Sequence, residues 1–208
     1  MFLRRVLRLT FVLAALALPG QALAGGGNYV FDGGTARERA TVRAALDASS
    51  FNWSLVPGTV TIHVARVGTS YATAGHIWLD AWLLAGERFS WGIVQHEYAH
   101  QVDFLLLGTD ARRQFQGLLG GRAYCGETPG VAHGDNTCER FASTLAWAYW
   151  PSRDNTLRPA SATDEAAAMP AATFRALLAT LLGPNVASVL NATASAPKPR
   201  AVSFAVRG

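Results

Sequence analysis

The segment from Ser90 to Leu107 has the sequence SWGIVQHEYAHQVDFLLL, which contains His-Glu-x-x-His at positions 96–100. Apolar residues recur through it with helical spacing, and it contains no proline. Successive residues of an α-helix turn by about 100°, so His96 and His100 would lie about 40° apart on one face, one turn apart. The segment therefore predicts a helix that places two imidazoles side by side.

Both ends of this segment carry residues typical of helix termini. Ser90 is a favourable N-cap, and Gly108 is a favourable residue just past the C-terminal end. The apolar residues within it are Ile93, Val94, Val102, Leu105 and Leu106. They predict a buried helix, in which two histidines and a glutamate are costly unless they are paired or bind a metal. A zinc site is the favoured interpretation, and hydrogen-bonded core polar groups are the alternative.

Glu97 has the position that a general base of a zinc hydrolase requires. Two histidines one helical turn apart can hold one Zn²⁺ ion. Glu97 lies about 100° round the helix from His96, so it can reach a water at the metal without being a ligand itself.

A catalytic zinc usually has three protein ligands and one open position. The candidates downstream of His100 are Asp103, His133, Asp135 and Glu139. We favour Glu139, because it begins a second predicted helix and a helix fixes a ligand better than a loop does. A first-turn glutamate could instead only stabilise the helix N-terminus. Asp103 is about 10 Å along the helix axis from His96, which suits it to hydrogen-bonding His100 or a neighbouring residue.

Residues 1–24 have the features of a secretory signal peptide. Arg4, Arg5 and Arg8 precede a short apolar run, and Ala22-Leu23-Ala24 offers a cleavage site. We expect cleavage after Ala24 and export, the alternative being a retained amphipathic anchor. Removal leaves 15 basic against 14 acidic residues, so the basic balance is no evidence for nucleic-acid binding. We expect no stable membrane anchor.

Residues 25–183 are expected to form one domain, followed by a loosely ordered tail over residues 184–208. The two cysteines are Cys125 and Cys138. In an exported protein such a pair most simply forms a disulfide, although two free thiols are the alternative.

The remaining sequence predicts an α+β fold. A capping box at Thr35 and Glu38 opens a helix that ends near Ser49. Residues 59–65 alternate as a strand, and residues 71–80 form one or two more, with an edge at 72–75 that an extended peptide could pair with. Further helices are expected at 109–119, 139–150, 164–169 and 170–182.

Over residues 90–150 the chain resembles the gluzincin branch of zinc metallopeptidases. The resemblance lies in His96-Glu97-Tyr98-Ala99-His100, with Asp103 after it, and in Glu139-Arg140-Phe141-Ala142. The nearest pattern is that of the catalytic domain of anthrax lethal factor and related secreted peptidases. It implies a zincin-like domain in which His96, His100 and Glu139 bind zinc, Glu97 moves a proton and Asp103 orients a ligand.

The chain departs from this pattern at one position. The related peptidases have a tyrosine a few residues before the glutamate ligand to help hold the oxyanion, whereas this chain has Val131-Ala132-His133 there. His133 or Tyr124 could take that role. The favoured function is a secreted zinc peptidase acting on a peptide or protein. The alternatives are an exported interaction module with a structural zinc site, and a zinc hydrolase of a non-peptide amide.

Overall fold

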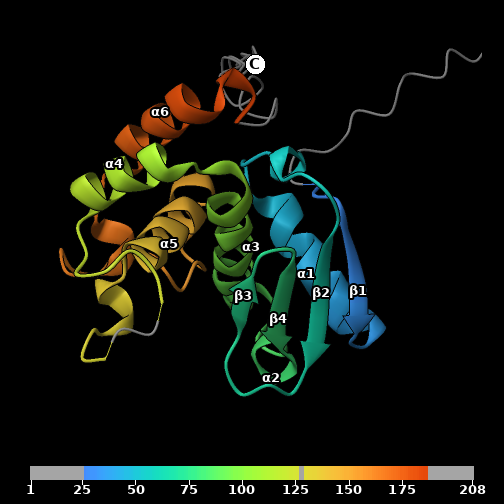
Figure 1. Cartoon of the computed structure of the whole chain (residues 1–208). Coiled ribbons are helices and arrows are strands. Elements are labelled where there is room, and N and C mark those ends of the chain that lie inside the picture. Colours follow the sequence, from blue (N-terminus) through green and yellow to red (C-terminus); the bar gives the residue numbers. More distant parts are fainter. Residues whose placement is uncertain (1–25, 127–128, 187–208) are drawn as a thin grey trace, which may run out of the picture.

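A computed structural model describes residues 26–126 and 129–186 of the chain. The expected signal peptide and most of the expected tail lie outside these residues. Within them, the chain forms a small mixed sheet and a set of helices, as expected for an α+β fold (Figure 1). No helix in the described ranges has the length and apolarity needed to cross a membrane.

The sheet has four strands in the order β1-β2-β4-β3. The strands are β1 (Tyr29–Gly33), β2 (Val60–Ala65), β3 (Tyr71–Thr73) and β4 (His76–Asp80). Strands β1, β2 and β4 are parallel, and β3 pairs with β4 in the antiparallel direction. Strand β2 alternates as predicted: Val60, Ile62 and Val64 are buried, whereas His63 is on the opposite face. The short strand β3 is one edge of the sheet.

Six α-helices accompany the sheet, and five short 3-10 helices connect or end them in the described residues. The α-helices are α1 (Ala36–Ala48), α2 (Ala81–Leu84), α3 (Trp91–Leu106), α4 (Thr109–Leu119), α5 (Thr137–Tyr149) and α6 (Ala171–Leu182). The 3-10 helices are η1 (Trp53–Leu55), η2 (Glu87–Ser90), η3 (His133–Asp135), η4 (Glu165–Ala167) and η5 (Pro184–Val186). The predicted capping box of α1 is present, with the Thr35 side chain accepting from the Glu38 amide.

Helix α3 is central to the packing. It packs on α5 more extensively than on any other element, and it also contacts α1 and the edge strand β3. The buried apolar residues of α3, α5 and the inner sheet face form one continuous core. Eleven residues of α3 are buried: Gly92 and every residue from Val94 to Asp103. The motif histidines are therefore held on a rigid element.

Helix α3 begins and ends at the predicted positions, beside Ser90 and just before Gly108, but neither residue caps it in the predicted way. Ser90 has helical backbone angles, and its hydroxyl donates to the Glu87 carbonyl because η2 leads directly into the helix. Gly108 is extended, with φ −74° and ψ 171°, and it precedes α4 instead of ending α3 in a left-handed turn. Residues 184–186, which were predicted to begin a loosely ordered tail, form η5, and Val186 in it is buried.

Candidate metal centre

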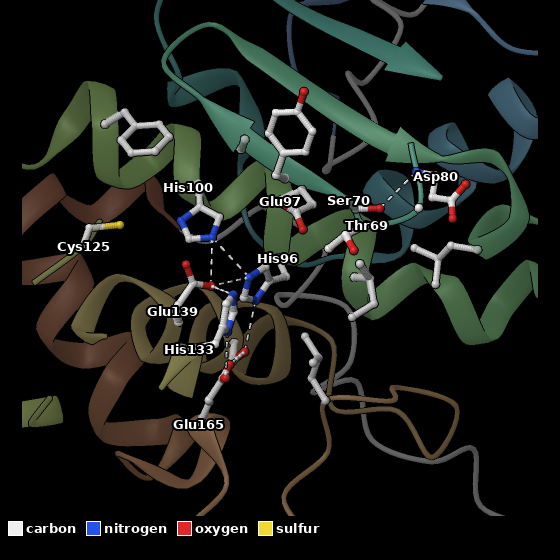
Figure 2. Close-up of a pocket in the computed structure, with 18 of the residues that line it drawn as sticks. Thr69, Ser70, Asp80, His96, Glu97, His100, Cys125, His133, Glu139 and Glu165 are labelled. Atoms are coloured by element: carbon white, nitrogen blue, oxygen red, sulfur yellow. Dashed lines mark hydrogen bonds and ion pairs between the residues drawn. The ribbon is translucent and has the colours of Figure 1, made fainter. Parts of the chain in front are cut away.

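Helices α3 and α5 bring His96, His100 and Glu139 together. Their ligand atoms all lie within 4.8 Å of one another. Glu139 Oε2 is 3.1 Å from His96 Nε2 and 3.3 Å from His100 Nε2, and the two Nε2 atoms are 3.2 Å apart (Figure 2). The three side chains face one another across the helix pair, as predicted from the spacing of the motif and the second helix.

This donor set fits a zinc ion. Three ligands at the usual Zn–N and Zn–O distances of a tetrahedral site are about 3.4 Å apart, so only small outward shifts of these atoms are required. Burial raises the pKa of Glu139, but hydrogen bonds from His100 and His96 lower it by more, so the net pKa falls well below its usual range. Glu139 is thus a buried anion for which a cation is the natural partner.

Three carboxylates act on His100 from the surrounding residues. Burial lowers the pKa of His100, but the hydrogen bond and charge of Glu139, with Glu97 and Asp103, outweigh burial and raise it. Glu139 and His96 both lie at Nε2 of His100. Its Nδ1 atom is buried and has no hydrogen bond among the described residues.

Glu97 is buried beside the triad and is 5% exposed. Its Oε2 atom is buried and has no hydrogen-bond partner in the described part of the chain. Burial raises its pKa, against the opposing effect of His96 and His100. An unpaired carboxylate oxygen next to three ligand atoms can accept a proton from a water bound there.

An open cleft of about 710 Å³ leads to these residues. Its walls include the triad, Glu97 and residues of the loop leading into the edge strand β3. They also include the apolar side chains of Ala72, Trp82, Leu83, Ile93, Phe104 and Leu157. The cleft gives the site access to solvent and to a substrate (Figure 2).

His133 reaches the site from η3. Its Nε2 is 3.2 Å from Glu139 Oε2, its Nδ1 is 3.3 Å from Glu165 Oε1, and its side chain is 71% exposed. It does not belong to the group of ligand atoms that all lie within 4.8 Å of one another. The role of His133 as an oxyanion donor stays a prediction, and its position at the mouth of the site is compatible with it.

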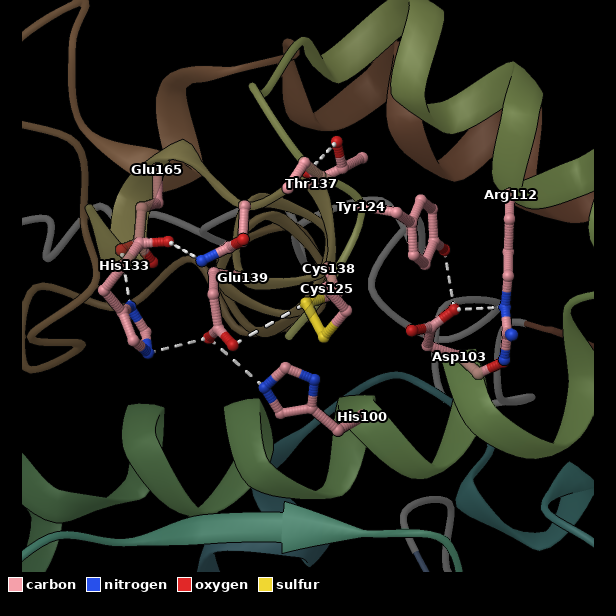
Figure 3. The surroundings of a disulfide bond; sticks show 12 residues. His100, Asp103, Arg112, Tyr124, Cys125, His133, Thr137, Cys138, Glu139 and Glu165 are labelled. Atoms are coloured by element: carbon pink, nitrogen blue, oxygen red, sulfur yellow. Dashed lines mark hydrogen bonds and ion pairs between the residues drawn. A yellow bond between two sulfur atoms is a disulfide. The ribbon is translucent and has the colours of Figure 1, made fainter. Parts of the chain in front are cut away.

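Tyr124 contacts Asp103 and Arg112. Its hydroxyl donates to Asp103 Oδ1 at 2.7 Å, and its ring packs against Arg112 (Figure 3). Burial and Asp103 raise the pKa of the Tyr124 hydroxyl, which keeps its proton on this bond. Tyr124 is therefore engaged with Asp103 and Arg112 in this structure, and its role as an oxyanion donor stays a prediction.

Asp103 bonds neighbouring residues instead of His100, and its role in orienting a ligand stays a prediction. It is 1% exposed, and its Oδ1 accepts from Arg112 Nε at 3.1 Å as well as from Tyr124. Within the described residues it makes no hydrogen bond to His100, because its carboxylate points toward α4 and the segment after it. It acts on His100 only through its charge. Asp135, another candidate for the third ligand, pairs with Arg140.

Cys125 and Cys138 form the predicted disulfide. Cys138 directly precedes Glu139, and its Sγ is 3.7 Å from Glu139 Oε1. The bond ties the segment that carries His133 to the first turn of α5 (Figure 3). The disulfide thus fixes the part of α5 that carries Glu139.

Two residues of the site were not predicted. Ser143 Oγ is 3.0 Å from His96 Nδ1 and donates to Glu165 Oε2 at 2.6 Å. Ser143 follows Glu139 by four residues, so helical periodicity could have identified it as a neighbour on the same face. Glu165 lies in η4 and has no local sequence signal that connects it with the motif.

Comparisons of the chain with protein-family profiles, with curated proteins and with solved structures gave no match. The described residues show a buried His96-His100-Glu139 group carried on two helices, consistent with a His-Glu-x-x-His site. The gluzincin resemblance stays an interpretation of the motifs.

Proposed function

We propose that the chain is an exported zinc-dependent peptidase of the zincin-like, gluzincin type. The observation that supports this most is the meeting of His96 Nε2, His100 Nε2 and Glu139 Oε2 beside the unpaired carboxylate of Glu97, at the base of an open cleft. A structural site would need no general base and no cleft.

The residues divide the chemistry among them. His96, His100 and Glu139 would hold the ion, which when bound supplies a Lewis acid for the scissile carbonyl and lowers the pKa of a water. Glu97 takes a proton from the attacking water at its Oε2 and passes it to the leaving amine. His133, whose Nδ1 pairs with Glu165, would donate from Nε2 to the oxygen that becomes negative when both of its ring nitrogens carry a proton, and its exposed position at the cleft supports this role.

A peptide is the substrate that the surrounding surface favours. Edge strand β3 contributes Tyr71 and Ala72 to the cleft wall. An extended peptide could align along this edge by adding a strand, which would present its backbone to the site. Export after cleavage near Ala24 is part of the proposal, and the disulfide between Cys125 and Cys138 supports it because such bonds persist in oxidising compartments.

The decisive experiment compares wild type with Glu97→Gln and a matched surface control. Glu87→Gln is the control, because Glu87 is 62% exposed and pairs only with Arg37. We expect about one zinc per chain in all three proteins, measured by elemental analysis. Cleavage of a peptide library should be lost in Glu97→Gln and unchanged in Glu87→Gln. Absence of stoichiometric zinc, or full activity of Glu97→Gln, would disprove the proposal.

A structural zinc site is the second candidate, and the position of His133 favours it. His133 Nε2 is 3.2 Å from Glu139 Oε2, so a movement of η3 could make it a fourth ligand. X-ray absorption of the zinc-loaded protein distinguishes the two functions: three imidazole ligands and no bound water would indicate a closed structural site. If zinc is bound in the open form but no peptide is cleaved, a non-peptide amide substrate becomes the favoured alternative.

A further inference from the structure

Glu165 lies between two imidazoles that belong to different elements. Its Oε2 accepts from Ser143 Oγ at 2.6 Å, and its Oε1 pairs with His133 Nδ1 at 3.3 Å. Ser143 in turn contacts His96 Nδ1 at 3.0 Å. One carboxylate therefore connects His96 on α3, through Ser143 on α5, with His133 on η3 (Figure 2).

This chain of hydrogen bonds determines which nitrogen of His96 carries a proton. The Ser143 hydroxyl has one proton and donates it to Glu165, so its oxygen can only accept from His96. His96 must then carry a proton on Nδ1, which leaves Nε2, on the side of Glu139 and His100, as the nitrogen available to a metal. Ser143 is fully buried, so bulk water does not compete for these bonds. An imidazole that binds a metal through Nε2 requires this tautomer.

The position of Glu165 is itself well determined. Its backbone carbonyl accepts from Thr144 Oγ1 at 3.4 Å, which joins η4 to α5. Gly134, next to His133, packs against the carboxylate: a Cβ at that position would approach Glu165 Oε1 to 3.1 Å. The side chain is thus held from the α5 side and from the η3 side.

We propose that Glu165 is the shared positioning residue of the site, which orients His96 for metal binding through Ser143 and holds His133 at the cleft directly. Its effect on His96 concerns the metal ligand alone, whereas its effect on catalysis through His133 rests on the proposed peptidase function. Glu165 is not itself in the group of mutually close ligand atoms, so it acts through these two neighbours.

The first test measures metal affinity and the state of the imidazoles. The variants are Glu165→Ala, Glu165→Gln and Ser143→Ala, with Glu87→Gln as the exposed control. We expect Glu165→Ala and Ser143→Ala to weaken zinc binding about 10- to 100-fold in chelator competition, the usual effect of losing a partner of a ligand. Glu165→Gln should lose less zinc affinity than Glu165→Ala, because its amide oxygen can still accept from Ser143. Glu87→Gln should bind zinc as wild type does.

The imidazole ¹⁵N resonances provide a readout that depends neither on zinc nor on activity. In the zinc-free protein, Glu165→Ala should shift the His96 and His133 resonances together, whereas Ser143→Ala should shift those of His96 alone. A general loss of structure would instead broaden all resonances, and circular dichroism identifies a variant that has not folded. If Glu165→Ala does not fold, Glu165→Gln is measured instead, and it should shift the His96 and His133 resonances by smaller amounts.

The second test uses kinetics at saturating zinc. Glu165→Ala and His133→Phe should each lower kcat, and the double variant should be no slower than His133→Phe, because both changes act on one side chain. The proposal is overturned if Glu165→Ala leaves zinc affinity within twofold of wild type and the His96 resonances unmoved. If zinc affinity falls as expected but wild type cleaves no peptide, the peptidase function fails while the positioning of His96 by Glu165 stands.

Discussion

At the residue scale, Tyr124 and His133 hold their polar atoms in different environments although both lie in the segment between α4 and α5. The Tyr124 hydroxyl is bound to the buried Asp103, whereas His133 faces Glu139 at the open cleft. A transition-state donor must be free to face the substrate. Tyr124 therefore supports α3 through its hydrogen bond to Asp103. Of the two residues, His133 is better placed to donate to an oxyanion in the cleft.

Substitution of each residue by phenylalanine separates these roles. His133→Phe should lower kcat about 10²-fold or more at saturating zinc, because one donor to the oxyanion is lost. Tyr124→Phe should change kcat little but lower the free energy of unfolding by about 1–2 kcal/mol, because Asp103 loses a hydrogen bond. Steady-state kinetics and urea unfolding measure the two effects. A large kcat loss in Tyr124→Phe with none in His133→Phe would reverse the assignment.

At the element scale, Gln101 connects the motif helix to the sheet edge. It is fully buried, directly follows His100, and bonds three backbone groups of the β3–β4 hairpin. Its Oε1 accepts from the Gly75 amide at 2.7 Å, and its Nε2 donates to the carbonyls of Thr73 and His76. The edge strand is thus held at a set distance from the ligand helix.

Replacement of Gln101 by leucine should release this hairpin. Three backbone groups lose their partner at about 1 kcal/mol each, so the free energy of unfolding should fall by about 2–3 kcal/mol. Hydrogen exchange should accelerate at Gly75, and KM for peptides should rise if β3 aligns the substrate as proposed. Gln114→Leu is the control, because Gln114 is exposed on α4. Unchanged exchange at Gly75 would show that Gln101 does not hold the turn.

The disulfide acts on the same scale, because it joins the segment after α4 to the start of α5. It links residues 13 apart in sequence. Closing a loop of this length contributes about 3 kcal/mol by restricting the unfolded chain. The double variant Cys125→Ser/Cys138→Ser should lose about 2–3 kcal/mol in urea unfolding. Its kcat should also fall, because Glu139 and His133 flank the bond; retained stability together with full kcat would contradict both expectations.

At the scale of the whole molecule, the triad connects helix α3 with helix α5. His96 and His100 are on α3 and Glu139 is on α5, which form the most extensive helix pair of the fold. A ligand that binds only the folded state stabilises it by mass action. Zinc bound between these helices should therefore raise the stability of the whole domain.

Removal of metal should lower Tm. If free zinc was about 1,000-fold above Kd, a chelator should lower the free energy of unfolding by about 4 kcal/mol and Tm with it. Added Zn²⁺ should restore Tm, whereas Mg²⁺ should not. His100→Gln should abolish the zinc-dependent shift. His76→Gln is the matched control, because His76 is exposed on β4 and contacts His63 instead of the triad. A shift that persists in His100→Gln would place the metal elsewhere.

Much of the fold and the centre of the site follow from local patterns. The helical spacing of His96, Glu97 and His100, the alternation of β2 and the capping box of α1 each depend on residues close in sequence. Glu139 was predicted because it begins a helix that had to pack on the first one. The positions at which α3 begins and ends were predicted, but Ser90 does not cap it with its side chain, because η2 continues directly into the helix.

The sequence by itself predicted the His96-His100-Glu139 group and the disulfide pair, because fixed spacing along a helix and a single pair of cysteines leave few alternatives. The tertiary structure alone decided which distant groups surround them. In the folded chain, Tyr124 and Arg112 hydrogen-bond to Asp103, and His133 lies at the cleft. Glu165 accepts from Ser143, which is 22 residues away in sequence. Such partnerships depend on how η4, η3 and α4 pack against α3 and α5, and no periodicity within one element encodes that packing.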